Sequence, residues 1–421
     1  MSGRLLPMRS LADLARRRQA LSAEALAEAA SIVNAVRTGG EAALREHAER
    51  FGDIRPGSPL FHDRAALDQA LARLPAGDRA RLERVAERIQ RFAAAQRRAL
   101  CPVAVPVPGG VAEHRIAPVE RAGCYAPGGR YPLPSSVLMT VVPARVAGVP
   151  DVWLASPKPQ VLTLAAAAIA GADGLVAAGG AHAIAALAYG AGPIAARDII
   201  VGPGNRYVTA AKQLVAGAVA IDLLAGPSEL TIFADGAADP GRVAADLLSQ
   251  AEHDPDAVPV LVTLDRTLPD RVELELARQL RDLPTAETER AALANGGVMV
   301  VASVDEGVAA CDAIAPEHLQ LDLREAVAVA PRLAHYGALF LGAGAAEVLG
   351  DYGAGPNHVL PTGGTARSTG GLSVYTFLRV RTWLRIDDRS AALPLIEDAV
   401  WLGRAEGLEA HARAAERRLQ S

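Results

Sequence analysis

The chain has few cysteines and few aromatic residues. Of its 421 residues 3 are cysteine, and Phe, Trp and Tyr together make up 4%. Cys101, Cys124 and Cys311 are widely spaced and form no CxxC pair, which argues against a disulfide scaffold or a thiolate metal site and favours a reducing compartment. Cys124 has no evident His or Asn partner nearby in the sequence, so we interpret it as a small buried apolar residue rather than a nucleophile.

The chain also lacks an excess of positive charge and long apolar runs. Its formal net charge is -4 without a long basic run, so nothing indicates binding to nucleic acid or to an anionic membrane. The Ala-rich stretch 161–170 is closed by Gly171, well short of a membrane span. The N-terminal residues do not have the long apolar core of a signal peptide. We therefore expect a cytoplasmic protein that binds neither membrane nor nucleic acid.

The remaining composition is that of a globular protein with more than one core. Half of the residues are apolar and 21% are charged, and 421 residues exceed the size of a single small domain. Apolar residues recur at three and four positions between residues 22 and 98, which predicts helices, and the Val-Pro alternation at 102–108 predicts an extended linker.

From residue 119 onwards short β-branched runs alternate with Ala-rich helical runs. This order predicts mainly parallel sheets with helices on both faces. Strands are expected at 151–155, 174–178, 198–201, 218–223, 230–234, 258–264, 297–301 and 338–341. Helices are expected at 136–147, 160–170, 182–189, 206–215, 241–252 and 325–334, with further helices at 395–402 and 406–419.

The fold class predicted by this pattern is α/β, with two Rossmann-like, mainly parallel sheet domains and helical extensions at both ends. Residues 1–25 are expected to form an N-terminal arm, and residues 26–118 together with 228–372 a first α/β domain. Residues 119–227 are expected to form the second α/β domain. The tail 373–421 is not needed to close a sheet, so we expect it to reach a partner chain.

Two residues on one predicted helix suggest a metal site. Gln250 and His253 stand three apart, so their side chains share a helix face, where they offer an amide oxygen and an imidazole nitrogen. These are half of a tetrahedral or octahedral metal site, and Asp351, His358 and His411 are candidates for the other half. Taken alone, the pair is more typical of a solvated helix end than of a metal site.

Two further segments carry chemistry-bearing side chains. Glu317 and His318 stand side by side just before a predicted strand, where one can activate water and the other can take a proton. Asp351 and His358 lie in the Gly- and Pro-rich segment 350–361, a composition that favours a rigid functional loop. By itself the Glu-His dipeptide would be read as an exposed loop.

Three Gly-rich turns are candidate nucleotide contacts. They are Pro127-Gly128-Gly129, Gly179-Gly180 and Gly202-Pro203-Gly204-Asn205. Each lies where a predicted strand passes into a helix, and free backbone amides at such a turn can hold a phosphate or ribose. Three such turns in one α/β half favour a nucleotide site, although each alone is an ordinary turn.

Taken together, these segments resemble the histidinol dehydrogenase family over nearly the whole chain. The motifs that carry the resemblance are Tyr125-Ala126-Pro127-Gly128-Gly129, Gly202-Pro203-Gly204-Asn205, Ala225-Gly226-Pro227-Ser228-Glu229, Leu248-Ser249-Gln250-Ala251-Glu252-His253, Pro316-Glu317-His318-Leu319 and Asn357-His358-Val359-Leu360-Pro361-Thr362. The resemblance implies a cytoplasmic homodimer with shared active sites and one Zn²⁺ per site. It implies oxidation of L-histidinol through L-histidinaldehyde to L-histidine with two NAD⁺, the last steps of histidine biosynthesis.

The resemblance also implies roles for particular residues. His318 matches the base, Glu317 matches the group that activates water, and the first α/β domain would hold the metal and these catalytic residues while the second binds NAD. The residues that match metal ligands are Gln250, His253, Asp351 and, from the other subunit's tail, His411. The residues that match substrate contacts are Ser228, Gln250, His253, His318, Asp351, His358, Glu406 and His411. The residues at cofactor-contact positions are Tyr125, His182 and Asn205.

One departure and two alternatives accompany this interpretation. His182 stands where many family members carry Gln, which adds a titratable group at a cofactor-contact position. The first alternative is a related zinc- and NAD-dependent enzyme that oxidises another amino alcohol or a sulfonated diol to the acid. The second is a metal- or ligand-binding protein without catalysis, against which the intact Glu317-His318 pair argues.

Overall fold

The computed structural model describes residues 4–16, 21–128 and 132–419. The chain divides into two compact units, which we describe separately. The first unit comprises residues 1–94 and 120–377, and the second comprises residues 95–119 and 378–421. No helix in the described ranges is both long enough and apolar enough to cross a membrane.

The first unit contains a six-stranded sheet with the order β1-β6-β5-β4-β7-β8. We call this sheet and the helices that pack on it the six-stranded layer. Its strands are β1 (Phe61–Asp63), β4 (Arg121–Tyr125), β5 (Asp151–Ala155), β6 (Gly174–Val176), β7 (Ile199–Val201) and β8 (Ala220–Ile221). β1 pairs antiparallel with β6, and all other neighbours are parallel. The parallel strands are short and apolar because helices cover them.

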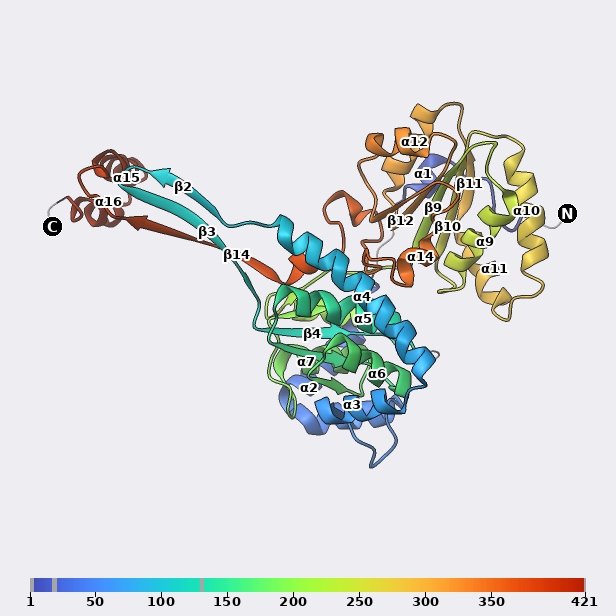
Figure 1. The fold of residues 1–421 in the computed structure, drawn as a ribbon, viewed down its shortest axis with the longest axis horizontal. Helices are drawn as coiled ribbons and strands as arrows, with labels where there is room; N and C mark the ends of the chain where they lie inside the picture. The colour runs from blue at the N-terminus through green and yellow to red at the C-terminus, as the bar shows by residue number, and fades with distance from the viewer. Residues whose placement is uncertain (1–3, 17–20, 129–131, 420–421) are drawn as a thin grey trace. The chain divides into compact units, whose positions relative to one another are not determined.

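From residue 121 onwards the helices of this part of the chain alternate with the strands. The helices between residues 23 and 215 are α2 (Ala23–Arg50), α3 (Arg64–Arg73), α4 (Ala76–Ala99), α5 (Pro134–Ala147), α6 (Val161–Ala170), α7 (Gly180–Tyr189) and α8 (Arg206–Val215). α2 packs against α7 and α8, and α3 packs against α6 (Figure 1). α6 and α7 are rich in buried alanine, which lets helices approach one another closely, and α5 and α6 end at Gly148 and Gly171 in left-handed backbone.

The other α/β layer of the first unit is a wholly parallel five-stranded sheet with the order β11-β10-β9-β12-β13. Its strands are β9 (Glu229–Ala234), β10 (Val258–Thr263), β11 (Gly297–Val300), β12 (His318–Asp322) and β13 (Ala338–Leu341). Its helices are α1 (Leu11–Leu14), α9 (Pro240–Ala251), α10 (Leu268–Gln279), α11 (Ala286–Asn295), α12 (Val304–Ile314), α13 (Ala326–Val329) and α14 (Glu347–Asp351). α9 and α11 pack against this sheet in one core cluster, and α12 packs on its other face (Figure 1).

The second unit is a three-stranded antiparallel sheet with two helices. Its strands are β2 (Val103–Val107), β3 (Gly110–Pro118) and β14 (Leu378–Ile386), in the order β14-β3-β2. The helices α15 (Leu393–Ala405) and α16 (Glu409–Glu416) follow and pack against each other (Figure 1). β2 is an edge strand, which is where Pro106 can be accommodated without the loss of a sheet hydrogen bond.

The predicted α/β class with two mainly parallel sheets and helical ends is confirmed, but several segments group differently from the expectation. Residues 61–63 pair with β6, and α2 and α3 pack on helices of the six-stranded layer. Residues 23–73 therefore group with the six-stranded sheet and not with residues 228–372 as expected, whereas Arg88 of α4 donates a hydrogen bond to the Gly353 carbonyl. The predicted linker at 102–108 forms β2, and the predicted helical tail begins with the long strand β14. These elements are defined by pairings between distant residues, which local periodicity does not encode.

Candidate active site

α9 carries one of the predicted metal ligands, Gln250, and a second, His253, follows the end of the helix. Asp239 caps the start of this helix by accepting a hydrogen bond from the Arg242 N–H, and Pro240 occupies its first turn. Gln250 lies in the last turn and is fully buried, and neither its amide oxygen nor its amide nitrogen has a hydrogen-bond partner among the described residues. Buried polar atoms are normally paired, so this amide is placed for a ligand that the polypeptide does not supply.

His253 lies two residues beyond the end of α9, in the turn that follows the helix, so it does not share a helix face with Gln250 as predicted. Its Nδ1 lies 3.0 Å from the Ser249 carbonyl oxygen, and because a carbonyl only accepts, Nδ1 carries the donated proton. Nε2 is therefore left with its lone pair. This Nε2 lies 3.7 Å from Oδ2 of Asp351, a carboxylate at the end of α14.

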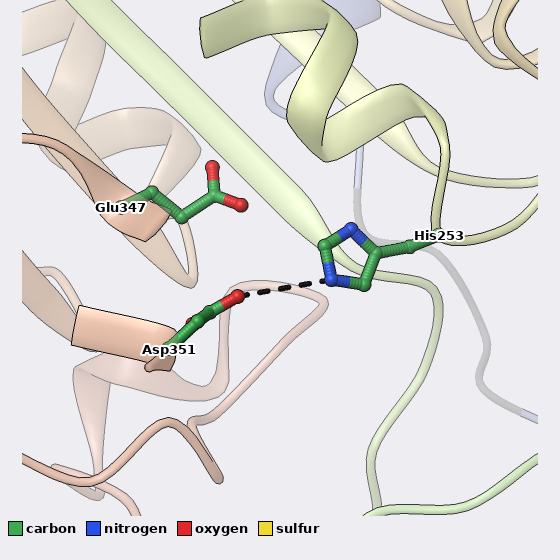
Figure 2. A group of neighbouring side chains, drawn as sticks. All are labelled: His253, Glu347 and Asp351. Carbon is green, nitrogen blue, oxygen red and sulfur yellow. Dashed lines mark ion pairs between the residues drawn. The ribbon is translucent and has the colours of Figure 1, made fainter. Parts of the chain in front are cut away.

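A third donor, Glu347, joins these two side chains. Donor atoms of His253, Glu347 and Asp351 all lie within 4.8 Å of one another (Figure 2). Two ligands bound to one zinc ion at about 2.0–2.2 Å in tetrahedral geometry stand about 3.3–3.6 Å apart, so side-chain movements of about 1 Å would bring the three donors to coordinating distance. We call His253, Glu347 and Asp351 the donor cluster. Sequence reasoning missed Glu347, although its spacing of four from Asp351 on a helix was a usable signal.

The carboxylates of the donor cluster lie in a buried and strongly charged surrounding. Burial raises the pKa of Glu347 to about 8. Burial would also raise the pKa of Asp351, but the imidazole of His318 and two further histidines hold it below the usual value. Amide, imidazole and carboxylate donors without a thiolate are a set that Zn²⁺, Mn²⁺ or Co²⁺ accepts. The side chains of Gln250, His253, Glu347 and Asp351 therefore offer ligand atoms of the kinds that bind a divalent metal ion.

Glu317 and His318 stand at the start of β12, and both are buried rather than exposed on a loop. Oε2 of Glu317 accepts a hydrogen bond from the Glu229 N–H at 2.9 Å, and Nδ1 of His318 donates to the Glu229 carbonyl at 3.1 Å. The backbone of β9 thus fixes both side chains. Nε2 of His318 has no hydrogen-bond partner within the described part of the chain and lies 3.7 Å from Oδ1 of Asp351.

The two groups of this pair influence each other's protonation. Burial raises the pKa of Glu317 to about 8, partly offset by His318. Burial lowers the pKa of His318, but the carboxylates of Glu317 and Asp351 outweigh it and raise the pKa above the ordinary value. Pairs of buried groups with shifted pKa values are typical of sites for proton transfer.

Two predicted substrate contacts lie next to these groups. Nδ1 of His358 donates to the Asp351 carbonyl at 3.1 Å, and its Nε2 lies 3.4 Å from Oγ of Ser136. Burial lowers the pKa of His358, which favours a neutral imidazole. Ser228 directly precedes Glu229 and the start of β9. The structure thus brings Ser228 and His358 to the same region as the Glu317-His318 pair and the donor cluster.

The predicted cofactor contacts gather at the carboxyl ends of the six-stranded sheet. The Tyr125 hydroxyl at the end of β4 accepts a hydrogen bond from the Gly180 N–H at 3.2 Å, where α7 begins. Asn205 follows β7 and caps α8, with Oδ1 accepting from the Tyr207 and Val208 N–H groups. The carboxyl edge of a parallel sheet is where nucleotides bind in open α/β folds. Of the turn at 127–129, Gly129 lies outside the described residues.

His182 has an internal partner that the sequence did not indicate. Its ring is buried, its Nε2 lies 2.8 Å from Oδ2 of Asp53, and it stacks on the rings of Phe51 and His47. The same Asp53 oxygen accepts a hydrogen bond from the Gly179 N–H at 2.7 Å. Asp53 also lines an open pocket of about 610 Å³. His182 therefore contributes to the Gly179–Gly180 turn through Asp53.

Two predicted site residues lie in the second unit. Glu406 follows α15, His411 lies in α16, and both side chains are exposed. Neither belongs to the donor cluster of the first unit. The single chain thus brings the Glu317-His318 pair, the donor cluster and His358 together, while the roles expected for Glu406 and His411 remain predictions.

Fold and site together define an α/β dehydrogenase with nucleotide-type turns on one sheet and a buried acid–base pair beside metal-type donors on the other. A family model described as histidinol dehydrogenase matches residues 15–419. The chain belongs to the histidinol dehydrogenase family, whose members use NAD⁺ and Zn²⁺.

Similarity to individual members extends over most of the chain. A histidinol dehydrogenase of Thermus thermophilus is 49% identical over 385 residues, covering 91% of this chain and 92% of the relative. One of Pseudomonas aeruginosa is 43% identical over 395 residues, covering 92% and 89%. The crystal structure of the Elizabethkingia anophelis enzyme superimposes with a TM-score of 0.93 at 30% identity, covering 100% of this chain and 99% of that structure.

Proposed function

We propose that this protein oxidises L-histidinol through L-histidinaldehyde to L-histidine with two NAD⁺, the last steps of histidine biosynthesis. The observation that carries the proposal is the buried Glu317-His318 pair, with Nε2 of His318 facing Asp351 of the donor cluster. A mere binding protein would not need an acid–base pair there. Each oxidation releases one hydride to NAD⁺ and one proton, so the whole reaction forms two NADH.

The metal is assigned to ligands from two protomers. Gln250, His253 and Asp351 would hold Zn²⁺ from one protomer, with His411 of the partner subunit as the fourth ligand. The unpaired amide of Gln250 and the free Nε2 of His253 support this assignment. Bound Zn²⁺ supplies an anchor for the amine and imidazole nitrogens of the substrate.

His318 is assigned as the base of the first oxidation. Its Nδ1 proton is held by the Glu229 carbonyl, so Nε2 is the atom that takes the alcohol proton while the hydride leaves for NAD⁺. The neighbouring carboxylates of Glu317 and Asp351 would stabilise the imidazolium that results.

Glu317 is assigned to the second oxidation. It activates the water that adds to the aldehyde, and its raised pKa of about 8 suits a carboxylate that must take up a proton near neutral pH. The hydrated aldehyde then gives its hydride to a second NAD⁺. Because both side chains are fixed by the backbone of one residue, Glu229, the two steps are carried out at one position.

Further residues are assigned to substrate and cofactor. Ser228, His358 and, from the partner subunit, Glu406 would contact the substrate. The cofactor is assigned to the six-stranded layer, near Tyr125, Asn205 and the turn before His182. The placement of the first two at the carboxyl ends of β4 and β7 supports this.

The assembly is proposed to be a cytoplasmic homodimer with shared active sites. Two observations support a partner for the second unit. Glu406 and His411 are exposed there, and so are large apolar side chains, namely Val380, Trp383, Leu384, Trp401 and Leu402. We assign the metal and catalytic residues to the domain of the five-stranded sheet and NAD to the domain of the six-stranded sheet.

The proposal is tested by counting NADH formed per histidinol consumed. A ratio of two is expected, and chelation should abolish turnover reversibly. A panel of other amino alcohols and sulfonated diols serves as the comparison. Faster turnover of one of these than of histidinol would contradict the substrate assignment, and no NADH formation from any alcohol by the Zn²⁺-loaded protein would contradict the assignment as a dehydrogenase.

A further inference from the structure

We propose that Glu347 is itself a ligand of the metal ion. The inference rests on the proposed metal centre and adds to it a residue that the family assignment does not contain. One protomer would then supply an imidazole, two carboxylates and an amide. The ion could therefore be held before any residue of the partner subunit takes part.

The first observation is that the Glu347 carboxylate is buried without a partner. Its exposed fraction is 1%, and neither carboxylate oxygen has a hydrogen bond from any residue that the structure describes. A buried carboxyl group without a donor costs several kcal/mol, so such groups are nearly always paired with a donor or a cation. A ligand is therefore expected at these oxygens.

The second observation is the direction in which Glu347 points. Its carboxylate projects from α14 towards the space between His253 and Asp351 (Figure 2). Glu347 and Asp351 stand four apart on one helix, so their side chains share a face. Their donor atoms and that of His253 lie within 4.8 Å of one another, close to the spacing that one ion requires.

The third observation is the sign of the charges around Glu347. The groups that act most strongly on it are one imidazole, His318, and three carboxylates, which belong to Asp351, Glu317 and Asp246. Carboxyl groups therefore predominate among the neighbours of Glu347. A divalent cation between Glu347 and Asp351 would offset their mutual repulsion and satisfy the unpaired oxygens in the same step.

The experiment measures Zn²⁺ affinity by competition with a chelating dye and records the visible spectrum of the Co²⁺-loaded protein. The test variant is Glu347→Gln, which keeps the shape and removes the charge. The positive control is Asp351→Asn. The matched control is Glu289→Gln, because Glu289 is also fully buried in the first unit with one unpaired oxygen, but lies on α11 away from the donor cluster.

A ligand and an outer partner of a ligand differ in the size of the expected effect. Loss of an outer partner weakens metal binding by roughly 10–100-fold. We expect Glu347→Gln to weaken Zn²⁺ binding by more than about 100-fold and to alter the Co²⁺ spectrum. Asp351→Asn should have an effect of the same size, while Glu289→Gln should change neither the affinity nor the spectrum. Glu347→Asp keeps the carboxylate one methylene shorter and should bind with intermediate affinity.

The outcomes separate this inference from the proposed function. If Glu347→Gln binds Zn²⁺ within tenfold of the unmodified protein with the same Co²⁺ spectrum, Glu347 is not a ligand and the four-residue assignment stands alone. If Glu347→Asp binds no better than Glu347→Gln, the effect is one of packing and the ligand role is wrong. If the unmodified protein binds neither ion, the proposed metal centre fails, and this inference with it.

Discussion

Replacing His318 by asparagine isolates the atom proposed to act as the base. In the His318→Asn variant the new amide nitrogen would stand near the position of Nδ1, so the hydrogen bond to the Glu229 carbonyl, 3.1 Å in the structure, can be kept. The variant deletes Nε2, the nitrogen that has no hydrogen-bond partner among the described residues and lies 3.7 Å from Asp351. The change therefore removes the proton acceptor with little loss of anchoring.

The expected loss of activity follows from the role of a general base. Such a group contributes about 10²–10⁴-fold, so kcat for histidinol oxidation should fall by about 10³-fold, which is about 4 kcal/mol in the barrier. Because the anchoring hydrogen bond is kept, Tm should fall by less than about 5 °C. Since His318 is not a proposed ligand, the metal content should not change.

The assay is initial-rate NADH formation at saturating histidinol and NAD⁺, with metal content and thermal unfolding measured on the same preparation. A kcat within tenfold of the unmodified enzyme would refute the role of His318 as base. A loss of metal as large as that of Asp351→Asn would show instead that His318 is a ligand, because the two side chains lie close enough to share an ion.

The remaining predictions address other parts of the site and the fold. Glu317→Gln should leave reduction of histidinaldehyde by NADH nearly intact but lower its oxidation by about 10²-fold or more, and equal loss of both rates would contradict the separate roles. His411→Ala should weaken Zn²⁺ binding by the dimer, and unchanged affinity would remove this residue from the ligand set. His182→Phe keeps an aromatic ring in the stack but loses the hydrogen bond to Asp53, which also accepts from the Gly179 N–H. KM for NAD⁺ should therefore rise about tenfold at unchanged kcat. An unchanged KM would show that the Gly179–Gly180 turn does not contribute to cofactor binding. Burial lowers the pKa of His62 in the folded protein, so the unfolded chain binds a proton there more readily. The contribution of His62 to the free energy of unfolding should therefore be complete above the pKa of the unfolded chain, about 6.5, and decline as the pH falls below it. The urea midpoints measured at pH 7.5 and 5.5 should then differ less in His62→Gln than in the unmodified protein.

Much of the local structure was predictable from short sequence windows. The expected helix at 206–215 and strand at 338–341 have the bounds of α8 and β13, because apolar periodicity and turn residues are local signals. The helix expected at 241–252 is α9 with bounds shifted by one residue, because a capping Asp239 and Pro240 fix the start of the helix that carries Gln250. For the catalytic pair, recognising the Pro316-Glu317-His318-Leu319 motif was needed, since a Glu-His dipeptide alone predicts an exposed loop.

Sequence alone therefore determined the α/β class, the helix that carries Gln250, and the family to which the chain belongs. Only the tertiary structure placed Glu347 with His253 and Asp351, paired His182 with Asp53, and joined β1 to β6 across more than a hundred residues. Local patterns record which backbone conformation a segment prefers. Contacts between distant segments depend on how whole helices and strands pack. That the Glu347 carboxylate is buried without a hydrogen-bond partner among the described residues can therefore be recognised only in the tertiary structure.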